Sequence, residues 1–117
     1  MLRTDSPYNR IEAATNGHLP AVSTRRQIDV LNARARALRE ADARQGLELA
    51  ETAHALATTA FYTEGCIASL TNQSHCYSWL SNFVGALASG LEALRLAEHL
   101  EVYADLCDVF LALAGAH

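Results

Sequence analysis

The sequence predicts an all-α fold in which antiparallel helix pairs stack as a short right-handed α-solenoid of about two and a half repeats. Three observations lead to this prediction. Of the 117 residues, 22 are alanine and 17 are leucine, and both are strong helix formers. Apolar residues recur at helical spacing between short polar joints. The chain also matches itself when it is shifted by 40 residues.

The first helices are predicted from their starting signals. Residues 1–22 are polar and mixed, with room for only a short helix, and the repeat domain is expected to occupy residues 23–117. A helix should follow Thr24–Gln27, which matches a capping box. Asp42, with Gln45 three residues later, should start the next helix. The apolar positions of these two helices are Ile28, Leu31, Ala35 and Leu38, then Leu47, Ala50, Ala53, Leu56 and Ala57.

Three more helices are expected after these two. The third spans residues 63–80, and Ser81-Asn82 forms a short turn before the fourth. The fourth ends near His99 and the fifth begins near Glu101. Such short joints force neighbouring helices to pack antiparallel. The apolar positions are Cys66, Leu70, Tyr77 and Leu80, then Phe83, Leu87, Leu94 and Ala97, then Val102, Leu106, Val109, Phe110 and Leu113.

The match at a shift of 40 residues decides the predicted architecture. It superposes Leu47 on Leu87, Ala53 on Ala93, Leu56 on Leu96, Ala57 on Ala97, Gly46 on Ala86, Leu70 on Phe110 and Asn32 on Asn72. Small residues that coincide with small residues matter because they lie where two helix axes approach most closely. A helix pair repeated at this period is typical of an α-solenoid. The alternative is an ordinary four- or five-helix bundle whose many alanines match by chance.

Residues 72–94 resemble a tetratricopeptide repeat. The residues that carry the resemblance are Ser74, Tyr77, Phe83, Ala86 and Ala93, which match the small, aromatic and alanine positions of that family. A weaker copy lies earlier in the chain, at Gly46 and Ala53, and the resemblance covers residues 28–117. The chain departs from the family in its 40-residue period, in Gln73 where leucine is common, and in lacking the closing proline. These departures resemble the longer repeats that precede output domains, such as diguanylate cyclases, in bacterial signalling proteins.

The repeat period also gives an expectation about the C-terminal end. The third unit stops halfway through a helix pair, so the domain is expected to be truncated there. A helix without its neighbour would leave Val109, Phe110 and Leu113 as an exposed apolar end. We therefore expect this end to support self-association, most simply as a homodimer.

Catalytic and metal chemistry is not expected. The sequence contains no glycine-rich phosphate loop, no nucleophile elbow and no paired-carboxylate motif. His75 and Cys76 are neighbours on one helix and point about 100° apart, so they cannot form a nucleophile–base pair. No metal-ligand spacing joins Cys66, Cys76 and Cys107, so we expect free thiols, no metal and no cofactor. The protein is thus not predicted to be an enzyme.

Charge and hydropathy restrict the partners and the location. The net charge is −4, which argues against nucleic-acid binding because that needs clustered cations. The longest apolar run, residues 109–116, is too short to span a bilayer, so no membrane association is expected. The N-terminus has no apolar segment typical of a signal peptide. The cytoplasm is the predicted location.

The candidate site is a groove on the first helix of each pair. In the family that this chain resembles, those helices line the concave groove, and the positions not needed for packing are Asn32, Arg36, Arg39, Asn72, His75 and Trp79. The arginines are suited to carboxylates, the asparagines to a peptide backbone and Trp79 to aromatic contact. The alternative to this binding role is that the arginines are solvated surface residues and that Trp79 packs at the helix end.

The predicted function is therefore a non-enzymatic protein-interaction module of a bacterial signalling protein. It would bind a peptide or a partner helix, or dimerise, and relay that state to an output domain. One alternative is a small helical sensor that binds a ligand in an internal apolar pocket. Another is a standalone helical bundle that acts as a dimeric adaptor.

Overall fold

The computed structural model describes residues 22–115, with side chains described for residues 22–101. Within that part four α-helices follow one another without any strand, namely α2 (Val22–Leu38), α3 (Ala43–Thr59), α4 (Thr63–Trp79) and α5 (Phe83–Gly115). The all-α prediction is confirmed. The expectation of a polar segment over residues 1–22 falls, except for its last residue, outside the described residues.

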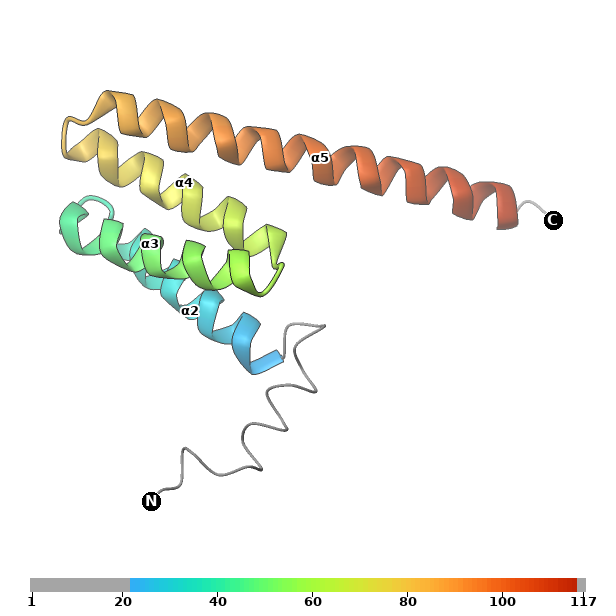
Figure 1. The fold of residues 1–117 in the computed structure, drawn as a ribbon, viewed down its shortest axis with the longest axis horizontal. Helices are drawn as coiled ribbons and strands as arrows, with labels where there is room; N and C mark the ends of the chain where they lie inside the picture. Colours follow the sequence, from blue (N-terminus) through green and yellow to red (C-terminus); the bar gives the residue numbers. More distant parts are fainter. Residues whose placement is uncertain (1–21, 116–117) are drawn as a thin grey trace, which may run out of the picture.

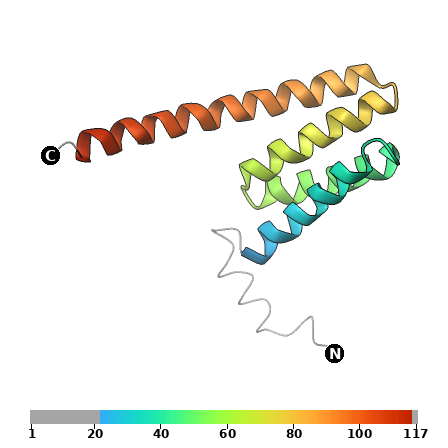
Figure 2. The same ribbon diagram turned by 180° about the vertical axis from the view of Figure 1, so that it is seen from behind.

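The helices form a row in which each packs against its neighbours. α2 packs against α3 and α4, and α4 also packs against α3 and α5. Figures 1 and 2 show that consecutive helices run antiparallel and that α2 and α5 lie at opposite edges of the row. α5 is nearly twice as long as the others and extends past the end of α4 (Figure 1).

Two of the helices begin with the same local structure, 40 residues apart. The backbone N–H of Gln45 donates to Asp42 Oδ1 at 3.2 Å, and that of Gly85 donates to Asn82 Oδ1 at 3.0 Å. An Asp or Asn side chain at this position satisfies an amide that the helix itself leaves unpaired. The predicted helix start at Asp42 and the predicted turn at Ser81-Asn82 are confirmed.

The predicted break near His99 and Glu101 is wrong. α5 continues from Phe83 to Gly115, so there is no separate fifth helix to begin a third pair. The physical reason is that residues 97–102 contain no glycine, no proline and no Ser, Thr, Asn or Asp that would cap a new helix. The local residues therefore favour continuation of the helix.

The predicted start of α2 is also corrected. Thr24 was expected at the N-cap, but α2 begins at Val22, so Thr24 lies inside the first turn. The capping-box spacing of Thr24 and Gln27 therefore does not mark the helix boundary. By contrast, the expected helix over residues 63–80 agrees with α4 to within one residue.

The core consists mostly of small side chains. Ala35, Ala50, Ala53 and Ala57 are fully buried, and Ile28 is the largest side chain that is fully buried. Gly46 lies so close to α2 and α4 that an added Cβ would be 3.1 Å from Cys76 Sγ and 3.2 Å from the carbonyl oxygen of Ala35. Small side chains let the helix axes approach, so van der Waals contact between helices replaces the burial of large residues.

The first part of α5 presents its small residues to α4. The hydroxyl of Ser74 donates to the carbonyl oxygen of Ala86 at 2.7 Å, and Ser89 and Ala93 are buried. Phe83, Leu87 and Leu94 were expected to pack inward, but they are exposed. The sequence predicted this helix correctly but predicted that its larger residues would be buried. The structure buries the smaller residues, because only they fit the close contact between α5 and α4. Among the described residues, no helix is long and apolar enough to cross a membrane.

Candidate functional site

Two asparagines join the two helix pairs at the base of the candidate groove. Asn32 on α2 and Asn72 on α4 are 7% and 4% exposed. Asn72 Nδ2 donates to the backbone oxygen of Asn32 at 3.1 Å and to its Oδ1 at 3.3 Å. Asn32 Nδ2 donates to the carbonyl oxygen of Gly65 at 3.2 Å. These hydrogen bonds connect α2 and α4 and occupy the amide nitrogens of both side chains, while their role in binding a peptide backbone stays a prediction.

Above this pair lies a shallow hollow of about 400 Å³ between α2 and α4. Its lining residues are Asp29, Asn32, Ala33, Arg36, Arg39, Ala68, Thr71 and Asn72. Four of the six residues proposed from the sequence thus border one surface feature. We call Arg36 and Arg39, the lining residues nearest the C-terminal end of α2, the rim of this hollow.

The rim of the hollow is electropositive. Arg36 is exposed and Arg39 is half-buried, and both lie close enough to His75 to affect its protonation. Burial lowers the pKa of His75, and the charges of Arg39 and then Arg36 lower it further, while Glu40 acts in the opposite direction. Desolvation first and the two arginine charges second thus disfavour the charged form of His75, and an anionic ligand would oppose the contribution of the arginines.

The remaining two candidate residues border a neighbouring hollow. His75, Ser78, Trp79 and Ser81 line it, at the C-terminal end of α4. Trp79 is 58% exposed and is the only tryptophan of the chain. Together the two hollows follow α4 from its middle to its end, and the six predicted residues lie on this one face.

A third hollow lies between α4 and α5. It is lined by Ile67, Thr71, Ser74, His75, Gly90, Ala93, Leu94 and Ala97. Thr71 belongs to the first hollow as well and His75 to the second, so all three belong to one continuous surface. This surface is open to solvent and is not an enclosed cavity.

Four residues of the first hollow were missed in the sequence, and two of them, Asp29 and Thr71, are polar. Asp29 precedes Asn32 by three positions on α2, and Thr71 is next to Asn72 on α4. Helical spacing from the asparagines would have found Asp29. Asp29 also accepts a hydrogen bond at 2.9 Å from the hydroxyl of Tyr62, whose ring carries Arg25 at 5.2 Å from its centroid. Hydrogen bonding to Asp29 raises the pKa of Tyr62.

The cysteines behave as small core residues. Cys66 and Cys76 are buried and free, as predicted, and burial raises the pKa of the Cys76 thiol. In the part of the chain with described side chains, no three His, Cys, Asp or Glu residues come together in a group that would hold a metal ion. Cys107 and the predicted apolar end formed by Val109, Phe110 and Leu113 lie beyond residue 101, where side chains are not described.

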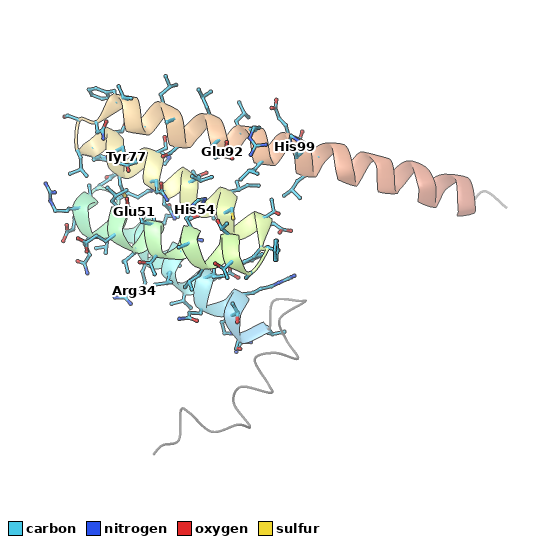
Figure 3. The ribbon with its side chains drawn as sticks, viewed as in Figure 1. Arg34, Glu51, His54, Tyr77, Glu92 and His99 are labelled. Carbon is cyan, nitrogen blue, oxygen red and sulfur yellow. The ribbon has the colours of Figure 1, made fainter. Side chains whose placement is uncertain are left out.

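Three of the residues labelled in Figure 3, Arg34, Glu51 and His54, line none of the three hollows. Arg34 projects at the edge formed by α2, and Glu51 and His54 project from α3. Arg34 does not line the hollow and serves below as a control for the two rim arginines.

Comparison with known proteins gives no relative: no family model, no curated protein and no solved structure matches this chain. The function must therefore be argued from the fold and the surface.

Proposed function

We propose that this protein is a non-enzymatic interaction module that binds an acidic peptide across α2 and α4, in the groove formed by the first two hollows described above. We further propose that the helix pairs α2–α3 and α4–α5 are successive units of a tetratricopeptide-like stack. The observation on which the binding proposal depends most is that Arg36 and Arg39 both line the first hollow, and the charges of both also lower the pKa of His75.

The repeat interpretation is supported by equivalent residues in equivalent places. Asn32 and Asn72 are 40 residues apart and hydrogen-bond to each other across the two units. The N-caps Asp42 and Asn82 are separated by the same interval and make the same hydrogen bond. α2 and α5 lie at opposite edges of the row, whereas the first and last helices of a four-helix bundle usually pack together. The proposed bacterial signalling context depends on the family resemblance alone.

The proposed ligand class follows from the charge on the groove. Residues 22–44 contain six arginines, whereas residues 45–117 contain only Arg95. Two of the six, Arg36 and Arg39, face the hollow, and a guanidinium pairs well with a carboxylate because it donates two parallel hydrogen bonds. An extended peptide with acidic side chains fits an open, shallow groove better than a compact metabolite does.

The alternative of an internal apolar pocket has no observation in its favour. The three hollows lie on the surface, and small side chains fill the space between the helices. We therefore do not propose a small-molecule sensor.

The experiment is a titration with a ten-residue peptide of alternating Glu and Ala, followed by the fluorescence of Trp79. We expect weak binding that the double variant Arg36→Ala/Arg39→Ala weakens by about 3- to 10-fold, since exposed ion pairs contribute modestly. The matched control Arg34→Ala/Arg44→Ala also removes two positive charges, at positions that do not line the hollow, and should change the affinity less than about 2-fold. If both double variants lost the same affinity for the peptide, only net charge would matter for binding. That result would refute the proposed binding in the groove.

The pH dependence gives a second test of the same site. The folded protein holds His75 neutral near pH 7, and an anionic peptide favours its charged form, so binding takes up a proton. Affinity should therefore rise as the pH falls from about 7.5 to 5.5, where the peptide remains ionised. The variant His75→Ala should remove this dependence, and an unchanged pH profile in that variant would contradict the assignment.

A further inference from the structure

The outer face of α5 carries an apolar stripe, formed by Phe83, Val84, Leu87, Leu91 and Leu94. These side chains are between 55% and 82% exposed. The same helix buries its small residues, among them Ser89 and Ala93, against α4. A helix that turns its large aliphatic residues to solvent and its small ones to the core is the reverse of an ordinary surface helix. Figure 3 shows side chains projecting from α5 on the side away from α4.

The spacing of the stripe is that of a helix–helix seam. Val84, Leu87, Leu91 and Leu94 are separated by three, four and three residues, as in the a and d positions of a coiled coil. Glu98 and Glu101, both exposed, follow on the same side of the helix and end the seam. The seam is therefore short and bounded, about three turns of helix.

We propose that the apolar stripe is the contact surface for a second copy of this chain, paired antiparallel through α5 around a two-fold axis. The spacing reads the same in both directions, so antiparallel pairing places Val84 opposite the partner copy's position 94 and Leu87 opposite its position 91. Each a position then meets a d position, as antiparallel helix pairs require. Ala88, at the centre of the seam, allows close approach.

The area and the edges of the stripe also suit a second copy. The five side chains expose roughly 500 Å², which is large for a patch on a monomer. Pairing two copies would bury about 1,000 Å² in total, the lower limit for a specific interface, so a micromolar dimer is expected. Phe83 would lie opposite the partner copy's position 95, where an arginine can contact the ring face. Leu94, at the edge of the stripe, also lines the third hollow, but the rim arginines lie on α2, so the stripe does not depend on the proposed peptide binding.

The test is sedimentation equilibrium of the full chain and of two stripe variants, Leu87→Glu and Leu91→Arg. Each variant alone should weaken the dimer by at least about 30-fold, because a charge enters the centre of an apolar seam. Circular dichroism should be unchanged, since both positions are exposed. The control Val30→Glu, at an exposed apolar residue on α2, should leave the dimer intact.

Mixing the two variants tests the antiparallel register. In the mixed dimer, the glutamate at position 87 of one copy meets the arginine at position 91 of the other, and the second contact keeps both leucines. A dimer should therefore return in the mixture, to within about 5-fold of the original affinity. A monomeric parent chain at millimolar concentration, a dimer that survives in both single variants, or variants that do not associate when mixed would each overturn the proposal.

Salt separates this association from peptide binding. The apolar dimer should be unchanged or strengthened in 0.5 M sodium sulfate, whereas binding of the acidic peptide should weaken. Weakening of the dimer by salt would mean that charge pairs hold the copies together, and would overturn the apolar stripe as the contact.

Discussion

Replacing Asn72 by alanine tests whether the buried asparagine pair holds the two helix pairs together. The change removes two hydrogen bonds to Asn32 and leaves the buried Oδ1 of Asn32 without this donor. A lost hydrogen bond costs about 1 kcal/mol, and a buried acceptor without a partner costs about 1–3 kcal/mol. Water from the adjoining hollow can reach the site, so we expect the lower part of this range, about 2 kcal/mol in total.

The companion change Asn32→Ala removes the same pair and the bond to Gly65, so it should cost about 2–3 kcal/mol. Because both variants delete one shared interaction, the double variant should be more stable than the sum of the two losses predicts, by about 1 kcal/mol.

The assay is urea unfolding followed by circular dichroism and by the fluorescence of Trp79. Urea unfolding gives the loss of free energy directly. In a thermal melt of the same variants, a loss of 2 kcal/mol should lower the melting temperature by about 8–16 °C in a domain of this size. Thr71→Ala is the matched control, because the Thr71 hydroxyl bonds only within α4, to the oxygen of Ile67, among the described residues. It should change stability by no more than about 0.5 kcal/mol. Strictly additive losses for the two asparagines, or losses as small as the control, would refute the reasoning.

Three further predictions concern the backbone at helix ends and close contacts. Gly65→Ala should destabilise the protein by about 1–3 kcal/mol despite the better helix propensity of alanine, because the added Cβ would lie 3.0 Å from the buried Ile28 and 2.6 Å from the Tyr62 ring. A variant that urea unfolding shows to be more stable would mean that these contacts relax freely. Phe61→Gly should stabilise the protein by about 0.5–1 kcal/mol, because Phe61 has φ 55° in the turn before α4 and its side chain is exposed. An unchanged melting temperature would show that the left-handed backbone conformation of Phe61 costs no stability. Asp42→Ala should lower the free energy of unfolding by about 1 kcal/mol and Asp42→Asn by much less, because an amide oxygen can cap the helix as a carboxylate oxygen does. Equal losses in the two variants would contradict the capping role.

The helices and their order could be predicted largely from local signals. Asp42 and Asn82 mark helix starts because their side chains cap free amides, and the structure places them where the sequence did. The break expected near His99 failed for the opposite reason. Nothing in the local sequence stops a helix there, so α5 continues through these residues.

Burial was harder to predict than helix position. Leu87 and Leu94 were assigned to the core because they are large and apolar, but the contact with α4 is too close for them and admits Ser89 and Ala93. Hydrophobic periodicity identifies an apolar face, and it does not say whether that face meets a neighbouring helix of the same chain.

The candidate groove was predicted in place but not in detail. The asparagines, the arginines, His75 and Trp79 all border the same face, since residues at equivalent positions of α2 and α4 lie side by side. The sequence could not show that Asn32 and Asn72 bond to each other, because that depends on the distance between two helices. The sequence also could not show that the charges of Arg36 and Arg39 both lower the pKa of His75.

The most direct test of the central claim is a residue-by-residue map of peptide binding by NMR. The alternating Glu–Ala peptide is added to ¹⁵N-labelled protein and the amide shifts are followed. The account predicts that the largest shifts fall on Arg36, Arg39, Thr71 and His75, with the Trp79 indole also shifted, and that Leu87 and Leu91 on the outer face of α5 stay unchanged. Shifts centred on α5, or spread evenly over all arginine-bearing segments including Arg34, would contradict a binding groove between α2 and α4.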